Sequence, residues 1–459
     1  MKKLCTVAIK NFISRHITST RTFALSFATV ILIGAFLLYC PFSASKHQLS
    51  FVNALFTSAS AVCVTGLTVI DIGKDLSTTG QIITMFLFQI GGLGIITFSL
   101  FFFGLMGRNI SFKGRYIVQS TFLHTPQRNF YFILKSVLLT TVIIESIGTL
   151  LLFIRFSKDF PVGKAFYHAL YNAVSAFNNC GYSLFSDNLT GYQTDLVVNL
   201  TVMGLIVLGG IGFIVHHEII LKLTDHRKKL SIHTKIVIFT TSILILAGAV
   251  LFYFFEYQNT IREFPLETKI LVSLFQSITS RTAGFNTVDI GHLTNNTILI
   301  ISILMFIGAS PGSTGGGIKT TSAALLFLII WNRFKGNEEV NIFNRTVPRE
   351  ILTRTISIIF ASAFSIVLFT TMLLFAGEGD KIAMESRHFF IEYLFEAISA
   401  FGTVGLSMGI TSHLNDLQKI LITILMFAGR VGLLTLALSL TLSSRKKSII
   451  YAEESVMVG

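Results

Sequence analysis

The stretch SLFQSITSRTAGFNTVDI, at residues 273–290, recurs in altered form at three other places in the chain. The related stretches are AVCVTGLTVID at residues 61–71, AFNNCGYSLFS at residues 176–186 and AFGTVGLSMGI at residues 400–410. Each stretch places one glycine shortly after a turn of small or polar residues, and these glycines are Gly66, Gly181, Gly284 and Gly405. The sequence therefore predicts four copies of one structural unit.

The segment before each glycine predicts a helix that enters the membrane and turns back. These segments are apolar, rich in small residues and about 12 to 15 residues long, which is too short to cross a hydrocarbon core of about 30 Å. Irregular backbone is tolerated at membrane depth only where protein or water covers it, so four such turns are expected to surround a water-filled pore. Ordinary glycine turns between membrane helices would explain one copy well, but they explain four matching copies poorly.

The glycine turns also predict the charge of what passes through the pore. Glycine adopts positive φ readily, which lets successive carbonyl oxygens point inward at a dehydrated cation. The short helices before the turns direct their partly negative C-terminal ends toward the same place. The predicted filter residues are Val64, Thr65, Gly66, Asn179, Cys180, Gly181, Thr282, Ala283, Gly284, Thr403, Val404 and Gly405.

The composition indicates an all-α polytopic membrane protein. Hydrophobic residues make up 52% of the 459 residues and charged residues only 13%, which excludes a set of soluble domains. The net charge of +13 lies mostly in alternate connecting segments, the positive-inside pattern, so no nucleic-acid partner is expected. This pattern places both termini in the cytoplasm of a multi-pass protein of the plasma (inner) membrane. The chain has four cysteines, scattered without paired spacing, so no disulfide framework is expected.

The predicted units cover residues 1–110, 111–230, 231–345 and 346–459, the last with a C-terminal tail. In each unit we expect a spanning helix, a re-entrant half-helix, a glycine turn and a returning helix, arranged with pseudo-fourfold symmetry around a central pore. The predicted spanning helices cover residues 23–40, 131–156, 235–255 and 352–375. The predicted half-helices cover residues 52–63, 164–178, 268–280 and 388–401. The predicted returning helices cover residues 79–103, 196–223, 297–331 and 417–442, for eight full transmembrane helices in all.

The third returning helix is interrupted by GASPGSTGGGIKTTS, at residues 308–322. Pro311 removes a backbone donor, and each glycine in a helix costs roughly 1 kcal/mol relative to alanine, so the segment is expected to unwind inside the membrane. A simple helix kink is the alternative, although a kink needs one proline and no run of glycines. The segment is not a phosphate-binding loop, because Ile318 separates Gly317 from Lys319.

This interruption is the predicted gate of the pore. The expected gate residues are Gly312, Gly315, Gly316, Gly317, Lys319 and Arg430. Charges inside apolar helices indicate functional sites. Arg430, in AGRVG, occupies the place that corresponds to the interruption and to QIGGLG (residues 89–94) and LGGIGF (residues 208–213). We expect it to donate hydrogen bonds to loop carbonyls or to present its charge to passing ions, while a purely structural tie between helices remains open.

Three further charged positions are interpreted as structural and not as part of the ion pathway. Arg281, just before Gly284, is interpreted as a brace behind the filter that is neutralised by Asp289, by Glu267 or by a helix C-terminus. Glu145 is interpreted as a hydrogen-bonded helix contact rather than a proton or ion relay. The group at residues 216–218 does not match H-E-x-x-H, so no metal site is expected there.

The motifs AVCVTGLTV, SRTAGFNTVDIG, GASPGSTGGGIKTT and FGTVGLSMG together resemble the membrane subunit of the Ktr potassium uptake systems, in the Trk/Ktr/HKT superfamily of cation transporters. The resemblance covers nearly the whole chain. It implies a homodimer in lipid, a cytosolic ring of RCK-type nucleotide-binding subunits, and a tail, YAEESVMVG, at the dimer interface. The second unit departs from the family's Asn-Asn-Ala-Gly-Phe pattern, because Cys180 and Tyr182 replace its alanine and phenylalanine.

The resemblance also implies the ion. Sodium preference in the plant HKT branch accompanies a serine at the first filter position, and Gly66 stands there in this chain, so K⁺ is expected at the carbonyls of Thr65, Cys180, Ala283 and Val404. The expected function is K⁺ uptake through a single-glycine filter, with nucleotide bound only by the partner and no cofactor on this chain. A sodium- or proton-coupled potassium or sodium transporter is the alternative. The sequence offers no nucleophile, base and orienting group for an enzyme.

Overall fold

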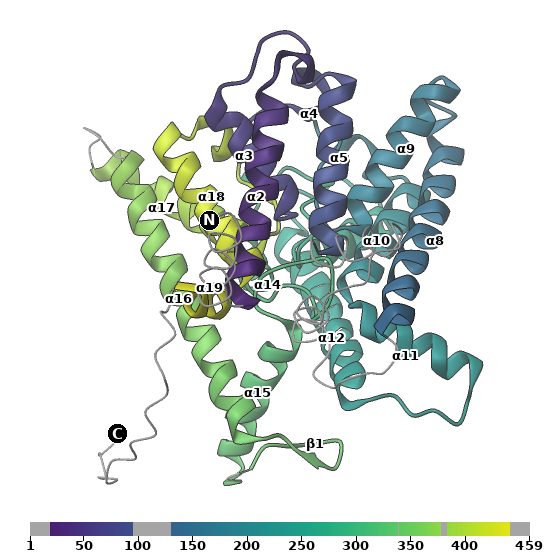
Figure 1. Cartoon of the computed structure of the whole chain (residues 1–459), viewed down its shortest axis with the longest axis vertical. Coiled ribbons are helices and arrows are strands. Elements are labelled where there is room, and N and C mark those ends of the chain that lie inside the picture. Colours follow the sequence, from purple (N-terminus) through teal and green to yellow (C-terminus); the bar gives the residue numbers. More distant parts are fainter. Residues whose placement is uncertain (1–18, 95–129, 338, 378–382, 441–459) are drawn as a thin grey trace, which may run out of the picture.

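The computed structural model describes residues 19–94, 130–337, 339–377 and 383–440 (Figure 1). Helices make up nearly all of the secondary structure in these residues, as the composition predicts. The exception is a small antiparallel hairpin of β1 (Asn341–Ile342) and β2 (Arg345–Thr346). In Figure 1 this hairpin and α15 lie at one end of the molecule, and α3, α4 and α5 lie toward the other.

Each predicted unit begins with a long apolar helix. These helices are α2 (Ser19–Tyr39), α8 (Phe130–Phe156), α12 (Ile232–Glu256) and α16 (Arg349–Gly377). Among the described residues they contain the four continuous helical segments that are long and apolar enough to cross a membrane. Large apolar side chains on them are well exposed, including Phe254 at 70% and Phe375 at 90%. Such faces are stable in contact with lipid rather than with water.

A shorter helix follows in each unit and packs against the long one. These half-helices are α3 (Phe51–Val62), α9 (Val162–Phe177), α13 (Leu266–Thr279) and α17 (Ala383–Gly402). The first three contain 12, 16 and 14 residues, so at 1.5 Å per residue they are about 18 to 24 Å long. They lie within two residues of their predicted bounds, whereas α17 begins five residues before the predicted residue 388.

The returning helices of the first, second and fourth units end earlier than expected, and the third is interrupted as predicted. They are α5 (Thr78–Leu93), α10 (Leu196–Gly210), α14 (Asn295–Phe306) and α18 (Asp416–Val431), followed by α11 (Phe213–Thr224) after α10, α15 (Thr320–Phe334) after α14 and α19 (Leu433–Leu440) after α18. The prediction of continuous helices at residues 196–223 and 417–442 was therefore wrong. The axes of α10 and α11 differ by 99°.

A glycine with positive φ stands at each of these breaks. Gly212 has φ 94° and Gly432 has φ 88°, and neither value belongs to a right-handed helix. Gly94, which ends α5, has φ 83°, and the rest of the predicted first returning helix lies outside the described residues. The third break is at residues 307–319, close to the predicted interruption at residues 308–322, although residues 320–322 already belong to α15. Eight full crossings stay a prediction, because among the described residues only the four long helices that begin the units are individually both long and apolar enough to span.

Short helices follow the glycine turns at one end of the molecule. They are α4 (Ile72–Asp75), η2 (Thr190–Tyr192), η3 (Ile290–His292) and η4 (Ile410–His413), and η1 (Pro41–Ser43) follows α2. Aspartates begin two of them, because Asp71 accepts from the amides of Gly73 and Lys74 and Asp289 accepts from the amide of Gly291. These caps order the segments that lead away from the filter glycines.

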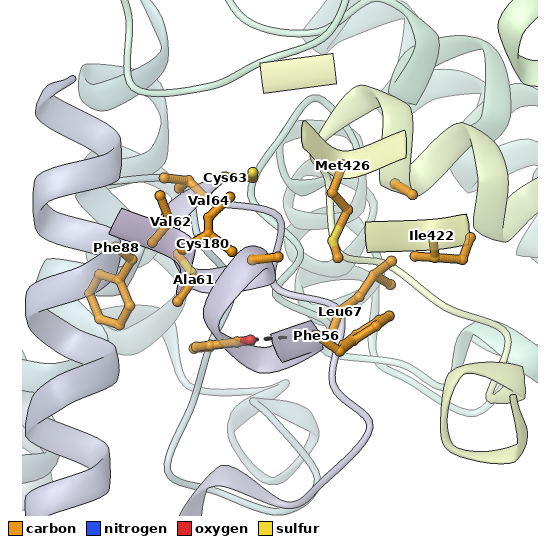
Figure 2. Packing of buried hydrophobic residues seen from close by; sticks show 14 of the residues in the cluster. Phe56, Ala61, Val62, Cys63, Val64, Leu67, Phe88, Cys180, Ile422 and Met426 are labelled. Atoms are coloured by element: carbon orange, nitrogen blue, oxygen red, sulfur yellow. Dashed lines mark hydrogen bonds between the residues drawn. The ribbon is translucent and has the colours of Figure 1, made fainter. Parts of the chain in front are cut away.

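The hydrophobic core joins the first unit to the fourth. Its largest cluster combines side chains of α2, α3 and α5 with side chains of α17 and α18. Figure 2 shows this contact, with Phe56 and Leu67 near Ile422 and Met426. Other clusters join the second unit to the third and the third to the fourth. The two ends of the described chain thus pack side by side, which allows the four units to form a closed ring.

Candidate ion pathway

The four predicted filter glycines meet at the centre of this ring. A β carbon built on any one of them would overlap the carbonyl oxygen of the residue that precedes the next glycine. The pairs are Gly66 with Cys180, Gly181 with Ala283, Gly284 with Val404, and Gly405 with Thr65. The contacts pass from the first unit to the second, third and fourth and return to the first. Only glycine can provide so close an approach of one backbone to another.

The same backbone conformation is repeated at all four turns. The glycines have φ values of 88°, 80°, 74° and 92° in chain order. The residue two positions before each glycine also has a positive φ, namely Val64 at 57°, Asn179 at 58°, Thr282 at 138° and Thr403 at 51°. Positive φ is rare for β-branched residues and persists only where the surroundings hold it, which is typical of functional sites.

The half-helices hold the turns through main-chain hydrogen bonds. The amides of Thr65, Cys180 and Val404 donate to carbonyls in the last turns of their half-helices, at 2.8, 2.9 and 2.9 Å. The amide of Ala283 donates to Thr279 O at 2.9 Å. The residues whose carbonyls face the neighbouring glycines are therefore fixed directly at helix C-termini. The partial negative charge of those termini favours a cation at the centre of the ring.

Hydroxyl and amide side chains behind the turns complete this support, and the sequence analysis missed them. Ser60 Oγ donates to Leu67 O at 2.8 Å, and Thr279 Oγ1 donates to Phe285 O at 2.6 Å. In the fourth unit Ser399 Oγ accepts from the Gly405 amide at 3.1 Å. These three residues stand six, five and six positions before their glycines. A hydroxyl side chain at this repeated spacing is a sequence pattern that could have predicted the support.

The second turn is held differently. Asn188 Nδ2 donates to Gly181 O at 3.2 Å, and Tyr182, which follows Gly181, places its hydroxyl 3.1 Å from Thr57 O and 3.4 Å from Leu67 O. The four turns share a backbone but not their supporting side chains. The backbone conformation of the ring therefore repeats four times, whereas the side chains that support it differ between units.

A cavity of about 770 Å³, the vestibule, opens from one side of the ring. All four filter glycines line it, together with residues that follow them in each unit. Four carboxylates lie in its wall, from Asp71, Asp75, Asp187 and Asp289, and none of the described residues that line it is lysine, arginine or histidine. A concave surface with charges of one sign raises the local concentration of ions of the opposite sign, so this vestibule attracts cations.

The glycine-rich interruption, residues 307–319, lies on the other side of the ring. It contacts the residues that come before the glycines, because the Gly316 amide donates to Thr403 Oγ1 at 2.9 Å. A β carbon on Gly315 would lie 2.8 Å from Thr282 Oγ1. The loop therefore lies directly beneath the filter turns of the third and fourth units, opposite the vestibule.

The loop also reaches the second unit. The Ser310 amide donates to Gly210 O at 3.0 Å, and the Phe213 amide donates to Gly312 O at 2.9 Å, across the break between α10 and α11. Thr314 Oγ1 donates to Phe177 O, at the end of α9, at 3.2 Å. The two ends of the loop meet through a parallel bridge between Ile307 and Ile318. The loop is a hydrogen-bonded strap across the centre of the molecule.

Two cations hold the carbonyls of this strap. Lys319 Nζ donates to Gly315 O at 2.8 Å and lies 3.4 Å from Gly316 O. Arg430 Nη1 donates to Thr314 O, and its Nη2 donates to Gly91 O and, at 3.3 Å, to Gly92 O. The structure thus places Arg430 beside the loop, where it joins the loop to the first unit. Three consecutive loop carbonyls receive bonds from these two positive charges.

The other charged residues have structural contacts. Arg281 is 5% exposed and donates from Nη1 to Thr241 O, in α12, at 3.2 Å. Asp289, one of the acids expected to neutralise it, pairs instead with His292 at 2.9 Å, because both lie in the η3 segment. Arg281 thus bonds a backbone carbonyl of α12 and not Asp289, one of the three expected partners.

Glu145 forms the helix contact that was expected of it. Asn178 Nδ2 donates to Glu145 Oε1 at 3.2 Å and to Gln89 Oε1 at 2.6 Å, behind the second filter turn. His216 Nε2 lies 2.6 Å from Leu208 O, and Glu218 accepts from the Ser231 amide at 3.0 Å. Within the described residues no group of three or more His, Cys, Asp or Glu side chains could hold a metal ion.

Known proteins share this sequence and fold. Residues 11–448 match the model of the TrkH family, described as cation transport protein. The Ktr system potassium uptake protein B of Bacillus subtilis is 36% identical over 445 residues, which are 96% of this chain and 97% of that protein. The potassium/sodium uptake protein NtpJ of Enterococcus hirae is 34% identical over 98% of this chain and 99% of its own length.

A solved structure supports the fold independently. The crystal structure of the potassium transporter TrkH from Vibrio parahaemolyticus aligns with 91% of this chain and 83% of its own, with a TM-score of 0.72 and 19% identity. The architecture is therefore the same although few residues are identical. From the near full-length match to the family and from relatives above 30% identity, we conclude that this chain belongs to the TrkH family of cation transport proteins.

Proposed function

We propose that this chain is the pore-forming subunit of a potassium uptake system. The observation that carries the proposal is the closed ring in which each filter glycine lies against the carbonyl oxygen of the residue before the next glycine. A ring of fixed carbonyls can replace the water shell of a cation. The names of the Ktr relatives from Bacillus subtilis and Vibrio alginolyticus, potassium uptake protein B, support K⁺ as that cation.

In this proposal K⁺ binds at the carbonyls of Thr65, Cys180, Ala283 and Val404. The vestibule, with its aspartates, concentrates the ion above the ring. A filter with one glycine per unit has fewer ordered layers of carbonyl oxygens than the filter of a potassium channel. The preference for K⁺ over Na⁺ is therefore expected to be less strict. The strain at Val64 and Thr403 is consistent with a backbone held for a specific ligand geometry.

The strap at residues 307–319 is the proposed gate. It lies beneath the ring, and hydrogen bonds hold most of its backbone, including those from Lys319 and Arg430. An element held by a few hydrogen bonds can have two arrangements that differ by a few kcal/mol, within the range that a bound partner can bias. Gly312, Gly315, Gly316 and Gly317 supply the conformational freedom for such a change.

The proposed assembly is a homodimer in the plasma membrane that works with a cytosolic RCK-type ring. The word "system" in the names of the Ktr relatives supports a further subunit. In this assembly the ring binds the regulatory nucleotide, both termini face the cytoplasm and lipid covers the exposed apolar helix faces. We propose that the ring docks near the basic residues 108–128 and 227–235, of which residues 108–128 lie outside the described residues, as do residues 451–459, expected at the dimer interface.

A second candidate is a sodium- or proton-coupled potassium or sodium transporter. The observation that favours it is the interruption of the returning helices at Gly212 and Gly432, since broken helices near the membrane midplane are a feature of coupled transporters. The relative from Enterococcus hirae is named a potassium/sodium uptake protein, which also keeps sodium open.

One flux experiment separates the two candidates. The purified chain is reconstituted in liposomes that hold a K⁺ gradient but no Na⁺ or pH gradient, and K⁺ movement is followed while the membrane potential is varied. K⁺ flux that follows the voltage and the K⁺ gradient alone supports the pore. Flux that appears only after a Na⁺ or proton gradient is imposed supports coupling, and vesicles with no K⁺ flux under any of these conditions contradict both.

A further inference from the structure

The residue that follows each filter glycine is buried behind the ring. These residues are Leu67, Tyr182, Phe285 and Leu406, and their exposed fractions are 1%, 1%, 0% and 2%. Three of them are purely apolar. Tyr182 alone carries a polar group, so its hydroxyl introduces at one corner an interaction that the other three corners cannot make.

The Tyr182 hydroxyl reaches across to the first unit. It lies 3.1 Å from Thr57 O, in α3, and 3.4 Å from Leu67 O, in the turn that contains Gly66. The ring of Tyr182 packs edge-on against Phe88, with centroids 6.4 Å apart. A side chain from the second turn is thus wedged behind the first turn and donates to its backbone.

Leu67 O has a second donor at the same place. Ser60 Oγ donates to it at 2.8 Å, from within α3. Tyr182 has one hydroxyl hydrogen, which Thr57 O at 3.1 Å and Leu67 O at 3.4 Å share, whereas Ser60 Oγ bonds Leu67 O. Turning the Leu67 carbonyl would leave the buried Ser60 hydroxyl without this acceptor and would remove the link to Tyr182, so the carbonyl is held in one orientation. Leu67 directly follows Gly66, so this anchor also limits how far the Gly66 turn can move toward or away from the ion.

We propose that Tyr182 is a positioning residue for cation selectivity, which acts by fixing the backbone of the first filter turn through Thr57 O and Leu67 O. The inference rests on the proposed function of the ring as a K⁺ filter. A filter favours the larger K⁺ only while its carbonyls resist closing around the smaller Na⁺ or reorienting toward it. Side chains that hold the turn therefore contribute to selectivity without touching the ion.

The test compares two tyrosine-to-phenylalanine variants that each lose one buried hydroxyl. Tyr182→Phe removes the donor to the first turn. Tyr171→Phe is the matched control, because Tyr171 is also fully buried and packs on the same Phe88, yet its hydroxyl is bonded to Thr84 Oγ1 at 2.8 Å and to no filter carbonyl. The measurements are the maximal K⁺ flux in proteoliposomes and, separately, the Na⁺ concentration that halves it.

We expect Tyr182→Phe to lower the preference for K⁺ over Na⁺ about three-fold, the scale set by one buried hydrogen bond, while its maximal K⁺ flux changes less. Tyr171→Phe is expected to keep the parental preference. Ser60→Ala removes the other donor to Leu67 O without disturbing the aromatic packing, and it is expected to shift the preference in the same direction. This variant decides the matter if Tyr182→Phe does not fold.

Each other outcome overturns the inference in a different way. A K⁺-selective parent whose preference survives both Tyr182→Phe and Ser60→Ala overturns the role of Tyr182 and leaves the filter standing. Equal losses in Tyr182→Phe and Tyr171→Phe assign the effect to the aromatic core instead of the bond to the turn. A parent with no preference for K⁺ contradicts the proposed function, and the inference fails with it.

Discussion

Gly405, in the fourth unit, lies against the carbonyl oxygen of Thr65, in the first unit, so closely that a β carbon would overlap it. This contact closes the ring, because the three other glycines make the corresponding contact with the unit that follows in the chain. Every turn therefore supports one neighbour and is supported by another. A change at one corner is expected to alter the geometry of the whole ring.

The first prediction concerns the filter glycines. Gly284→Ser adds a side chain where Gly284 has φ 74° and faces Val404 O, so the two turns must separate. A residue forced into such a conformation costs about 1 to 3 kcal/mol, and we expect about a ten-fold loss of the preference for K⁺ over Na⁺ in competition assays. Gly204→Ser is the matched control, because no atom outside its own helix lies within 4 Å of a β carbon there. Unchanged competition in Gly284→Ser would show that the ring is not the filter.

The second prediction concerns Arg430. Arg430→Ala removes the guanidinium that joins Thr314 O to Gly91 O, so the strap should leave its position more easily. We expect a several-fold higher K⁺ flux in proteoliposomes at equal protein density. Arg430→Lys should give an intermediate flux, because one ammonium cannot reproduce a planar fork between two acceptors. Arg262→Ala, at an exposed position between α12 and α13, is the control. A folded Arg430→Ala variant with parental flux would make Arg430 a structural tie alone.

The third prediction concerns the strap itself. Deletion of residues 315–317 removes the segment that contacts Thr282 and Thr403 and shortens the obstruction beneath the ring. We expect a higher K⁺ flux than in Arg430→Ala and less dependence on the proposed cytosolic ring. Lys319→Met removes only the charge that binds Gly315 O, so it separates the effect of charge from the effect of length. If the deletion variant folds and dimerises but conducts no faster than the parent, closure must occur at the returning helices.

The fourth prediction concerns stability. A β carbon on Gly209 would overlap Phe177 O, and one on Gly429 would overlap Phe401 O, so the second and fourth returning helices each touch the end of their own half-helix. Backbone atoms at a helix end cannot move aside, and we expect Gly209→Ala and Gly429→Ala each to lower the free energy of unfolding by about 2 kcal/mol. Thermal unfolding in detergent measures this. Gly204→Ala, in open space on α10, should be as stable as the parent or slightly more stable, and an equal loss there would contradict the explanation.

The fifth prediction concerns the partner. Arg227, Lys228 and Lys229 are exposed between α11 and α12, on the side predicted to be cytoplasmic. Reversing all three to glutamate should abolish co-purification with the proposed nucleotide-binding ring and remove the nucleotide dependence of K⁺ flux. Lys158, also exposed, follows the C-terminal end of α8, on the side predicted to face away from the cytoplasm. Reversal of its charge is the control. Retained binding and regulation in the triple variant would place the docking surface elsewhere.

The positions of the half-helices could be predicted from the sequence because their signals are local. The α3 helix begins at Phe51 after the capping residue Ser50, and α13 begins directly after Pro265. A short apolar segment between such a start and a glycine has few alternative structures in a membrane. The same reasoning placed the interruption at residues 308–322, where proline and clustered glycines cannot continue a helix, and the structure has it at residues 307–319.

The breaks at Gly212 and Gly432 could not be predicted in this way. One glycine costs a helix only about 1 kcal/mol, so LGGIGF and AGRVG are compatible with a continuous helix on local grounds. What decides the break is the strap, because the Phe213 amide bonds to Gly312 O and Arg430 binds Thr314 O. Those partners are distant in the sequence, and no local pattern encodes their approach.

By itself the sequence determined the four units, their order and the glycine at the centre of each, since apolar segment length and backbone freedom are properties of a few adjacent residues. Only the tertiary structure decided which carbonyl each glycine faces, where the hydroxyl of Tyr182 binds and which carbonyls Lys319 and Arg430 hold. The physical reason is that a hydrogen bond between distant segments depends on displacements of a few tenths of an ångström. Such precision arises only when all four units pack against one another and close the ring.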